Sequence, residues 1–355
     1  MQVGIQFFPD IGPDVKSARD YWQEALTLVR LCDRYGYSHV RTVEHYFNPY
    51  GGYSPNPVVF LAAAAQATKR ARLVTGAVLP VFNNPLKLAG ELGMLDALSD
   101  GRLDIGFARA FLPHEFARFG VRLDESRARF DEGVEQVRLL LEQENVTCEG
   151  HFHSFRNVTS LPRPTQKPRP PFYVAAQATP ESFERAGTAG YGIMAIPMAG
   201  GAMAELIGTY REAWRRAGHP GQGTVMLAFH MFCHSDQAEA ERIARGPLNR
   251  YLHSLVAAAS DWMAGASSAD YPGYDKIIAG LSRETFETMV EKCAAWVGTP
   301  QRILDTVATY CRQIGDFEIA SLQVNFNDIT LKDAETSMRL FGEEVLPRMP
   351  RLIAG

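Results

Sequence analysis

The feature that most constrains the fold of this chain is an alternation between short apolar runs and longer segments of helical period. The short runs are rich in Val, Ile and Phe, which favour strands, and the longer segments carry apolar residues at helical spacing. This alternation is typical of βα units, whose strands lie parallel in one sheet. Eight strands are predicted, at residues 3–8, 38–43, 71–79, 102–108, 172–176, 192–196, 225–233 and 319–324.

Helices are predicted between these strands. Gly36 ends the first of them and a proline opens the second, as expected for helix ends and starts. A polar, histidine-containing stretch before residue 161 is predicted as an insertion, and residues 236–284 are less regular. The helices are placed at residues 17–35, 57–68, 86–98, 127–143, 180–189, 203–217, 300–313 and 333–345. Eight strands favour closure over an open sheet, so we predict an α/β fold, a (β/α)8 TIM barrel with insertions at its C-terminal face, formed by residues 1–355 as one domain.

Composition narrows the class of protein. With 46% hydrophobic and 21% charged residues, the chain is typical of ordinary globular proteins. A net charge of −4 argues against nucleic-acid and anionic-lipid partners. The N-terminus lacks a signal-peptide pattern, and no apolar run of about 18 residues indicates a membrane span. We therefore expect a cytoplasmic protein without membrane or nucleic-acid partners.

Metal and disulfide chemistry are not indicated. The five cysteines are scattered and lack CxxC spacing, which argues against a zinc ribbon or a disulfide scaffold. His230 and His234 would share a face of their strand, but no third ligand completes a site. We expect no metal.

Active sites of such barrels lie at the C-terminal ends of the strands. The second predicted strand ends in Glu44 and His45, a carboxylate beside an imidazole, which is a suitable pair for acid–base catalysis. A purely structural histidine is the alternative.

The fourth strand is followed by Arg109 in a stretch of small residues, which suits a ligand phosphate. Arg127 begins a later helix, and residues 175–181 offer backbone N–H groups at a helix N-terminus. The two arginines and this helix start would converge on one phosphate, with ordinary salt bridges as the alternative.

Several segments together resemble the luciferase-like flavin-dependent monooxygenases over nearly the entire chain. The most specific is the block at residues 72–110, RLVTGAVLPVFNNPLKLAGELGMLDALSDGRLDIGFARA. The others are EHYF at 44–47, SRARFDEG at 126–133, PFYVAAQATPES at 171–182, GYGIM at 190–194 and RLFGEEVLP at 339–347.

The resemblance implies a role for individual residues. His45 would stand near the reacting edge of the flavin and assist oxygen chemistry beside Glu44, and Gly76 and Ala77 would form a cis peptide under the ring. Ala108 takes the position of a cysteine in luciferase and leaves room beside the ring, and Met194 would form its apolar wall. The phosphate would be held by Arg109 and Arg127 and by the residues that open the following helix, which are Ala176, Gln177, Ala178 and Thr179.

The resemblance also implies an activity. We expect a reduced-FMN-dependent monooxygenase that uses O2 through a flavin hydroperoxide to oxygenate an apolar organic substrate. A separate reductase would supply the flavin, and the protein would be a homodimer. An F420-dependent hydride-transfer dehydrogenase and a non-catalytic flavin-binding subunit are the alternatives. EHYF favours FMN over F420, and the retention of His45, Arg109 and Arg127 argues against a non-catalytic subunit.

Residues from about 260 to 290 break the βα rhythm with small and turn-forming residues. Their position after the seventh strand matches a mobile active-site loop of the luciferase-like family. A barrel mouth that must admit flavin and then exclude water needs a movable cover. We therefore expect this segment to be a lid, with an ordinary surface excursion as the alternative.

Overall fold

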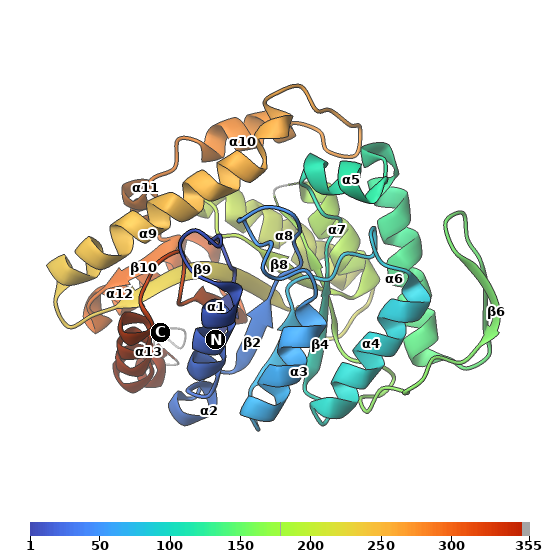
Figure 1. The fold of residues 1–355 in the computed structure, drawn as a ribbon, viewed down its shortest axis with the longest axis horizontal. Helices are drawn as coiled ribbons and strands as arrows, with labels where there is room; N and C mark the ends of the chain where they lie inside the picture. Colours follow the sequence, from blue (N-terminus) through green and yellow to red (C-terminus); the bar gives the residue numbers. More distant parts are fainter. Residues whose placement is uncertain (178, 350–355) are drawn as a thin grey trace.

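Eight parallel strands close into a barrel in the computed structural model, which describes residues 1–177 and 179–349 (Figure 1). The order β11-β1-β2-β3-β4-β7-β8 is closed because β9 pairs with both β8 and β11. The predicted TIM barrel is therefore confirmed. Its strands are β1 (Gln2–Phe7), β2 (His39–Thr42), β3 (Arg72–Thr75), β4 (Leu103–Phe107), β7 (Phe172–Ala175), β8 (Gly192–Ala195), β9 (Val225–Cys233) and β11 (Ile319–Gln323).

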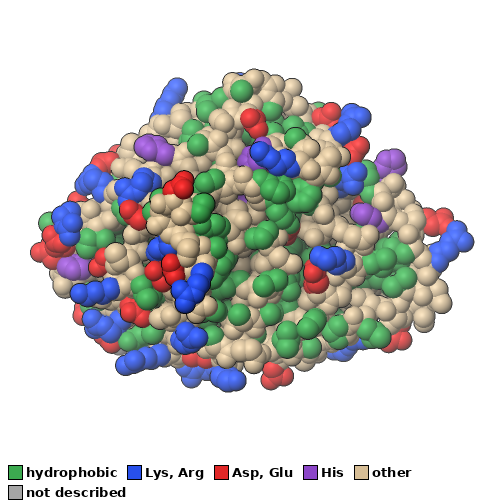
Figure 2. Space-filling view, viewed as in Figure 1, with side chains coloured by type: hydrophobic (Ala, Val, Ile, Leu, Met, Phe, Trp, Pro, Cys, Tyr) green, Lys and Arg blue, Asp and Glu red, His purple; other side chains and the backbone are tan. Residues whose placement is uncertain are grey.

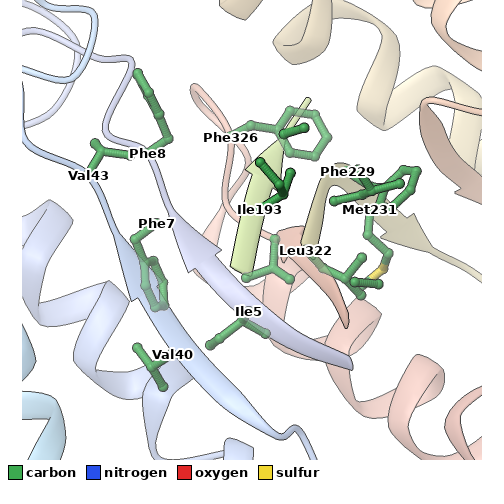
Figure 3. Packing of buried hydrophobic residues seen from close by; sticks show 14 of the residues in the cluster. Ile5, Phe7, Phe8, Val40, Val43, Ile193, Phe229, Met231, Leu322 and Phe326 are labelled. Atoms are coloured by element: carbon green, nitrogen blue, oxygen red, sulfur yellow. The ribbon is translucent and has the colours of Figure 1, made fainter. Parts of the chain in front are cut away.

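Helices surround the barrel and bury one face of each strand. Side chains such as Ile5, Phe7 and Val40 lie on neighbouring strands in this outer core (Figure 3), and the Phe7 ring meets Phe60 edge-on at 5.4 Å. Several of these helices begin at a side-chain cap followed by proline, as Asn56 and Asn84 show. The surrounding helices are α1 (Ala18–Val29), α3 (Pro57–Ala67), α4 (Pro85–Leu98), α6 (Ser126–Glu142), α7 (Pro180–Ala189), α8 (Gly200–Arg216), α12 (Pro300–Ile314) and α13 (Leu331–Glu344).

The structure refines three parts of the predicted secondary structure. The helix predicted at residues 17–35 is broken into α1 and a short α2 (Cys32–Tyr35), which ends at Gly36 with φ 81°. The polar insertion is a hairpin of β5 (Val146–Glu149) and β6 (Ser154–Val158). A further strand, β10 (Ala295–Gly298), pairs with the last four residues of β9, beyond the part that pairs with β8.

The stretch from residue 236 to 284, predicted as less regular, contains a 22-residue helix, α9 (Gln237–Ala258). Pro247 lies inside this helix, and the Gly246-Pro247 pair hides the helical period in the sequence. Beyond it, the segment at about 260–290 that we predicted as a lid contains η2 (Ser260–Trp262), α10 (Tyr274–Leu281) and most of α11 (Phe286–Glu291). In Figure 1 α10 lies at the same end of the barrel as α5 (Pro113–Phe119), the helix that follows β4.

None of the helices in the described part of the chain is both long and apolar enough to cross a membrane. The described residues also contain no group of three His, Cys, Asp or Glu side chains arranged to hold a metal ion.

Candidate active site at the barrel mouth

His45 lies just after β2 and is tied to a carboxylate from another part of the chain. Its Nδ1 atom is 3.1 Å from Oε1 of Glu115, in the first turn of α5, and the same oxygen accepts a hydrogen bond from the Tyr46 amide at 2.8 Å. The Glu115 side chain is fully buried. An ionised Glu115 requires the proton on Nδ1, which leaves Nε2 of His45 free for a reacting group.

The His45 ring is enclosed by aromatic side chains and by a glycine turn. Phe8 and Tyr50 lie 5.5 Å from its centroid, and Phe111 meets it edge-on at 6.0 Å. Gly51 has φ 82°, and a Cβ atom at this position would lie 2.6 Å from the Cβ of His45. The turn therefore requires glycine both for its conformation and for its close approach to the ring.

Glu44 is buried and accepts three hydrogen bonds from its surroundings. Its oxygens accept from the Leu79 amide at 2.9 Å, from Asn83 Nδ2 at 2.9 Å and from the Tyr46 hydroxyl at 2.5 Å. Burial raises the pKa of this carboxyl to about 7, and the charge of Glu115 adds to the rise, while the three hydrogen bonds oppose it. These contacts join the end of β2 to the segment after β3. A catalytic role for Glu44 stays a prediction.

Three of the predicted flavin contacts come together inside the barrel. Ala77 and Met194 belong to one buried cluster with Val74, and Ala108 packs against it. The peptide bond between Gly76 and Ala77 is cis, as the resemblance implied. The small side chains of Ala77 and Ala108 and the apolar side chain of Met194 form a lining that suits an aromatic ring system.

Arg109 and Arg127 converge on a third residue that the sequence did not single out, Asp270 of the segment between α9 and α10. The Asp270 carboxylate accepts hydrogen bonds from the Arg127 amide at 2.8 Å and from the Ser126 hydroxyl at 3.0 Å. Arg109 Nη1 donates to the carbonyl of Asp270 at 2.8 Å, and its guanidinium lies 4.6 Å from the centroid of the Tyr271 ring. The start of α6 therefore already holds a carboxylate oxygen, and Arg109 holds the backbone carbonyl of the same residue.

The predicted helix-start contacts lie next to this group. Ala176 donates its amide to the Met194 carbonyl at 2.9 Å, and Gln177 is half-buried. Thr179 is the residue before the first turn of α7, and its hydroxyl lies 2.7 Å from that of Ser182. Arg127 reaches the same helix through Glu181, 3.2 Å from Nη1. Ala178 lies outside the described residues.

Two residues of this site were missed from the sequence. Glu115 is not among the residues predicted from the sequence, yet it is the hydrogen-bonding partner of His45. A signal was present, since an acidic residue opens the first helix after β4 at the catalytic end of the barrel. Asp270 carried no such signal, because it lies between elements in an irregular stretch.

The comparison with known families decides the class of this barrel. A family described as luciferase-like monooxygenase matches residues 1–316. The chain belongs to this family. It is a flavin-dependent monooxygenase.

A curated relative, the oxygenase component of the flavin-dependent trigonelline monooxygenase of Acinetobacter baylyi, is 30% identical over 305 residues, covering 84% of this chain and 82% of the relative. The crystal structure of monooxygenase RslO1 from Streptomyces bottropensis is 43% identical, with a TM-score of 0.88 over 98% of this chain and 99% of the other.

More distant structures share the fold. The oxygenating constituent of 3,6-diketocamphane monooxygenase from Pseudomonas putida, in complex with FMN, has a TM-score of 0.82 at 22% identity and covers 98% of this chain and 99% of that chain. The F420-dependent tetrahydromethanopterin reductase from Methanopyrus kandleri has a TM-score of 0.73 at 18% identity over the same shares.

Proposed function

We propose that this monooxygenase uses reduced FMN and O2 to oxygenate an organic substrate, and that a separate reductase supplies the flavin. The convergence of Arg109, Arg127 and Ser126 on one residue, Asp270, carries this proposal, because the same donors suit a phosphate. The name of the relative from Acinetobacter baylyi, an oxygenase component, supports a separate reductase. The relative is flavin-dependent, which favours FMN over F420.

Different residues of the site would bind the phosphate and the ring of the flavin. The flavin phosphate would be held by Arg109, Arg127 and the residues at the start of α7, which are Ala176, Gln177 and Thr179. The ring would lie along Gly76, Ala77, Ala108 and Met194. Reduced flavin, when bound, activates molecular oxygen for transfer to the substrate.

Around the ring, Nε2 of His45 would accept or donate a proton while Glu115 keeps the other nitrogen protonated. The segment from η2 to α10 would exclude water from the mouth. Its anchors to the mouth support this reading, since Trp262 donates to the Phe111 carbonyl at 2.8 Å and the Tyr271 hydroxyl donates to the Ala110 carbonyl at 2.9 Å.

Oxygen consumption and product mass with photoreduced FMN test this function against a panel of aliphatic, aromatic and carrier-bound substrates. Reduced F420 replaces FMN in a parallel series. Incorporation of an oxygen atom from labelled O2 with FMN is the expected result. Flavin-independent turnover, or hydride transfer with F420 alone, would contradict it.

We also propose a cytoplasmic homodimer that pairs through the face of α3 and α4. Figure 2 shows hydrophobic side chains gathered on this face, where Val59 is 69% and Met94 is 56% exposed. Exposed apolar patches of this kind suit a protein interface. Light scattering during gel filtration measures the mass in solution, and a monomer at micromolar concentration would contradict the proposal.

A further inference from the structure

A row of four buried polar side chains crosses four neighbouring strands inside the barrel. His230 of β9 is the register partner of Gln323 of β11, which is the partner of Gln6 of β1, which in turn is the partner of Arg41 of β2. Register partners in neighbouring strands share one face of a sheet. All four side chains are at most 9% exposed, so the row forms one polar layer in the barrel interior.

Arg41 is the only charged member of this polar row. Burial lowers the pKa of His230 to about 3, so its imidazole is neutral. Arg41 donates from Nη1 to Gln6 Oε1 at 2.7 Å and from Nη2 to the Gly76 carbonyl at 3.0 Å, while its Nε atom has no partner. No carboxylate of the described residues lies within ion-pair distance of it. A second interior arginine, Arg72, by contrast contacts Asp104 at 2.6 Å.

Further atoms of the polar row lack partners. Gln323 Oε1 and His230 Nε2 make no hydrogen bond in the described structure, although both are buried. Buried polar groups without partners cost free energy, and a buried guanidinium without a counter-charge costs more. Such a cluster needs an explanation, and a ligand group that brings negative charge and further hydrogen-bonding atoms supplies one.

The polar row touches the surface that we propose lies under the flavin ring. Arg41 contacts Gly76, whose cis peptide with Ala77 forms that surface, and a Cβ atom at residue 76 would overlap Arg41 Nε. At the other end of the row, the Tyr251 ring from α9 meets the His230 ring at 4.4 Å and its hydroxyl is 3.5 Å from that of Tyr50. Tyr50 also contacts His45. The row therefore lies between the proposed flavin surface and the proposed proton-transfer residue.

We infer that Arg41, supported by Gln6, Gln323 and His230, binds a negatively charged group at the barrel mouth. This inference rests on the proposed function and adds a charge requirement to a pocket that the sequence predicted as apolar. Two groups have this chemistry. One is the pyrimidine edge of reduced flavin, which is anionic at neutral pH, and the other is an acidic group of the substrate.

Two binding measurements on the full-length protein test the inference and separate the two sources. The first compares the affinities of reduced and oxidised FMN under anaerobic conditions. The second, made without flavin, compares benzoate with benzamide, which has a similar shape and no charge. Each is made on the wild type, on Arg41→Met, which removes the charge, and on Arg41→Lys, which keeps it. Circular dichroism and gel filtration check that the variants fold.

The wild type should bind reduced FMN more tightly than oxidised FMN, or benzoate more tightly than benzamide, by roughly 10-fold or more. This is the scale of a charge-assisted hydrogen bond. Arg41→Met should lose that preference, and Arg41→Lys should keep part of it. If Arg41→Met loses only the preference for reduced FMN, the negatively charged group belongs to the flavin. If it loses the preference for benzoate, the negatively charged group belongs to the substrate.

The inference is overturned if the wild type shows neither preference, and this outcome does not depend on whether the variants fold. It is also overturned if Arg41→Met retains the preference of the wild type. Failure of the proposed function would give a different result from failure of this inference. In that case none of the three proteins would bind FMN in either the reduced or the oxidised form.

Discussion

The carboxylate of Asp270 accepts a hydrogen bond from the backbone amide of Arg127 at 2.8 Å, although the two residues are 143 positions apart. The Ser126 hydroxyl donates to the same oxygen, and Arg109 donates to the Asp270 backbone carbonyl. One residue of the predicted lid therefore occupies the donors that we propose for the flavin phosphate. A carboxylate and a phosphate cannot use these donors together, so cofactor binding and the position of the lid are expected to be coupled.

Replacing Asp270 by Asn should strengthen FMN binding, because it removes a negative charge that competes with the phosphate. We expect roughly 5- to 10-fold tighter binding, less than the full value of a hydrogen bond between charged groups. Riboflavin lacks the phosphate and should bind equally to both proteins. Asp275→Asn, a matched change at an exposed position of α10, is the control. Equal affinities of wild type and Asp270→Asn for FMN in fluorescence titrations would refute the competition.

The same substitution should loosen the lid in the flavin-free protein. Asp270 is one of three anchors of this segment, and Trp262 and Tyr271 provide the others. Limited proteolysis should cleave Asp270→Asn faster than wild type between residues 261 and 289. Cleavage at equal rates would show that the aromatic anchors hold the segment by themselves.

Replacing Arg109 by Ala should weaken FMN binding by roughly 1–3 kcal/mol, the scale of a lost charge-assisted hydrogen bond. The loss should be small for riboflavin, which distinguishes a lost phosphate contact from a damaged ring pocket. Unchanged FMN affinity in a titration would remove Arg109 from the phosphate site.

Replacing His45 by Ala should keep the fold and most of the flavin affinity but lower the yield of oxygenated product per flavin consumed. The expected loss is roughly 10²–10⁴-fold, the usual range for a general acid or base. Glu115→Gln should lower the product yield less than His45→Ala does, because an amide oxygen can still accept a hydrogen bond from Nδ1 of His45. A wild-type product yield from His45→Ala would exclude His45 from proton transfer.

The stability of the protein should fall as pH rises because of Glu44. Burial raises the pKa of this carboxyl from 4.5 to about 7, so the folded protein keeps a proton that the unfolded chain releases. The unfolding free energy should therefore decrease between these two pH values, by at most about 1.4 kcal/mol per pH unit from this group. Urea unfolding of Glu44→Gln from pH 5 to 8 should give a flatter slope than wild type or Asp275→Asn. Parallel slopes would show that Glu44 titrates normally.

The sequence by itself determined the barrel, because strands and helices are encoded in patterns a few residues long. The alternation of apolar runs and helical periods predicted all eight barrel strands, and the family motifs placed His45, Arg109 and Arg127 at strand ends or helix starts. Where local patterns were interrupted, prediction failed. A proline inside α9 hid its helical period, and β10, which follows α11 in the irregular part of the sequence, was missed.

Tertiary structure alone decided which residues meet. Glu115 reaches His45 across 70 positions, and Asp270 reaches Arg127 across 143. The polar row of Arg41, Gln6, Gln323 and His230 exists only because closure of the barrel brings β9 and β11 beside β1 and β2 in one register. No local pattern records such pairings, since they depend on strand order and on loops that bring distant segments together.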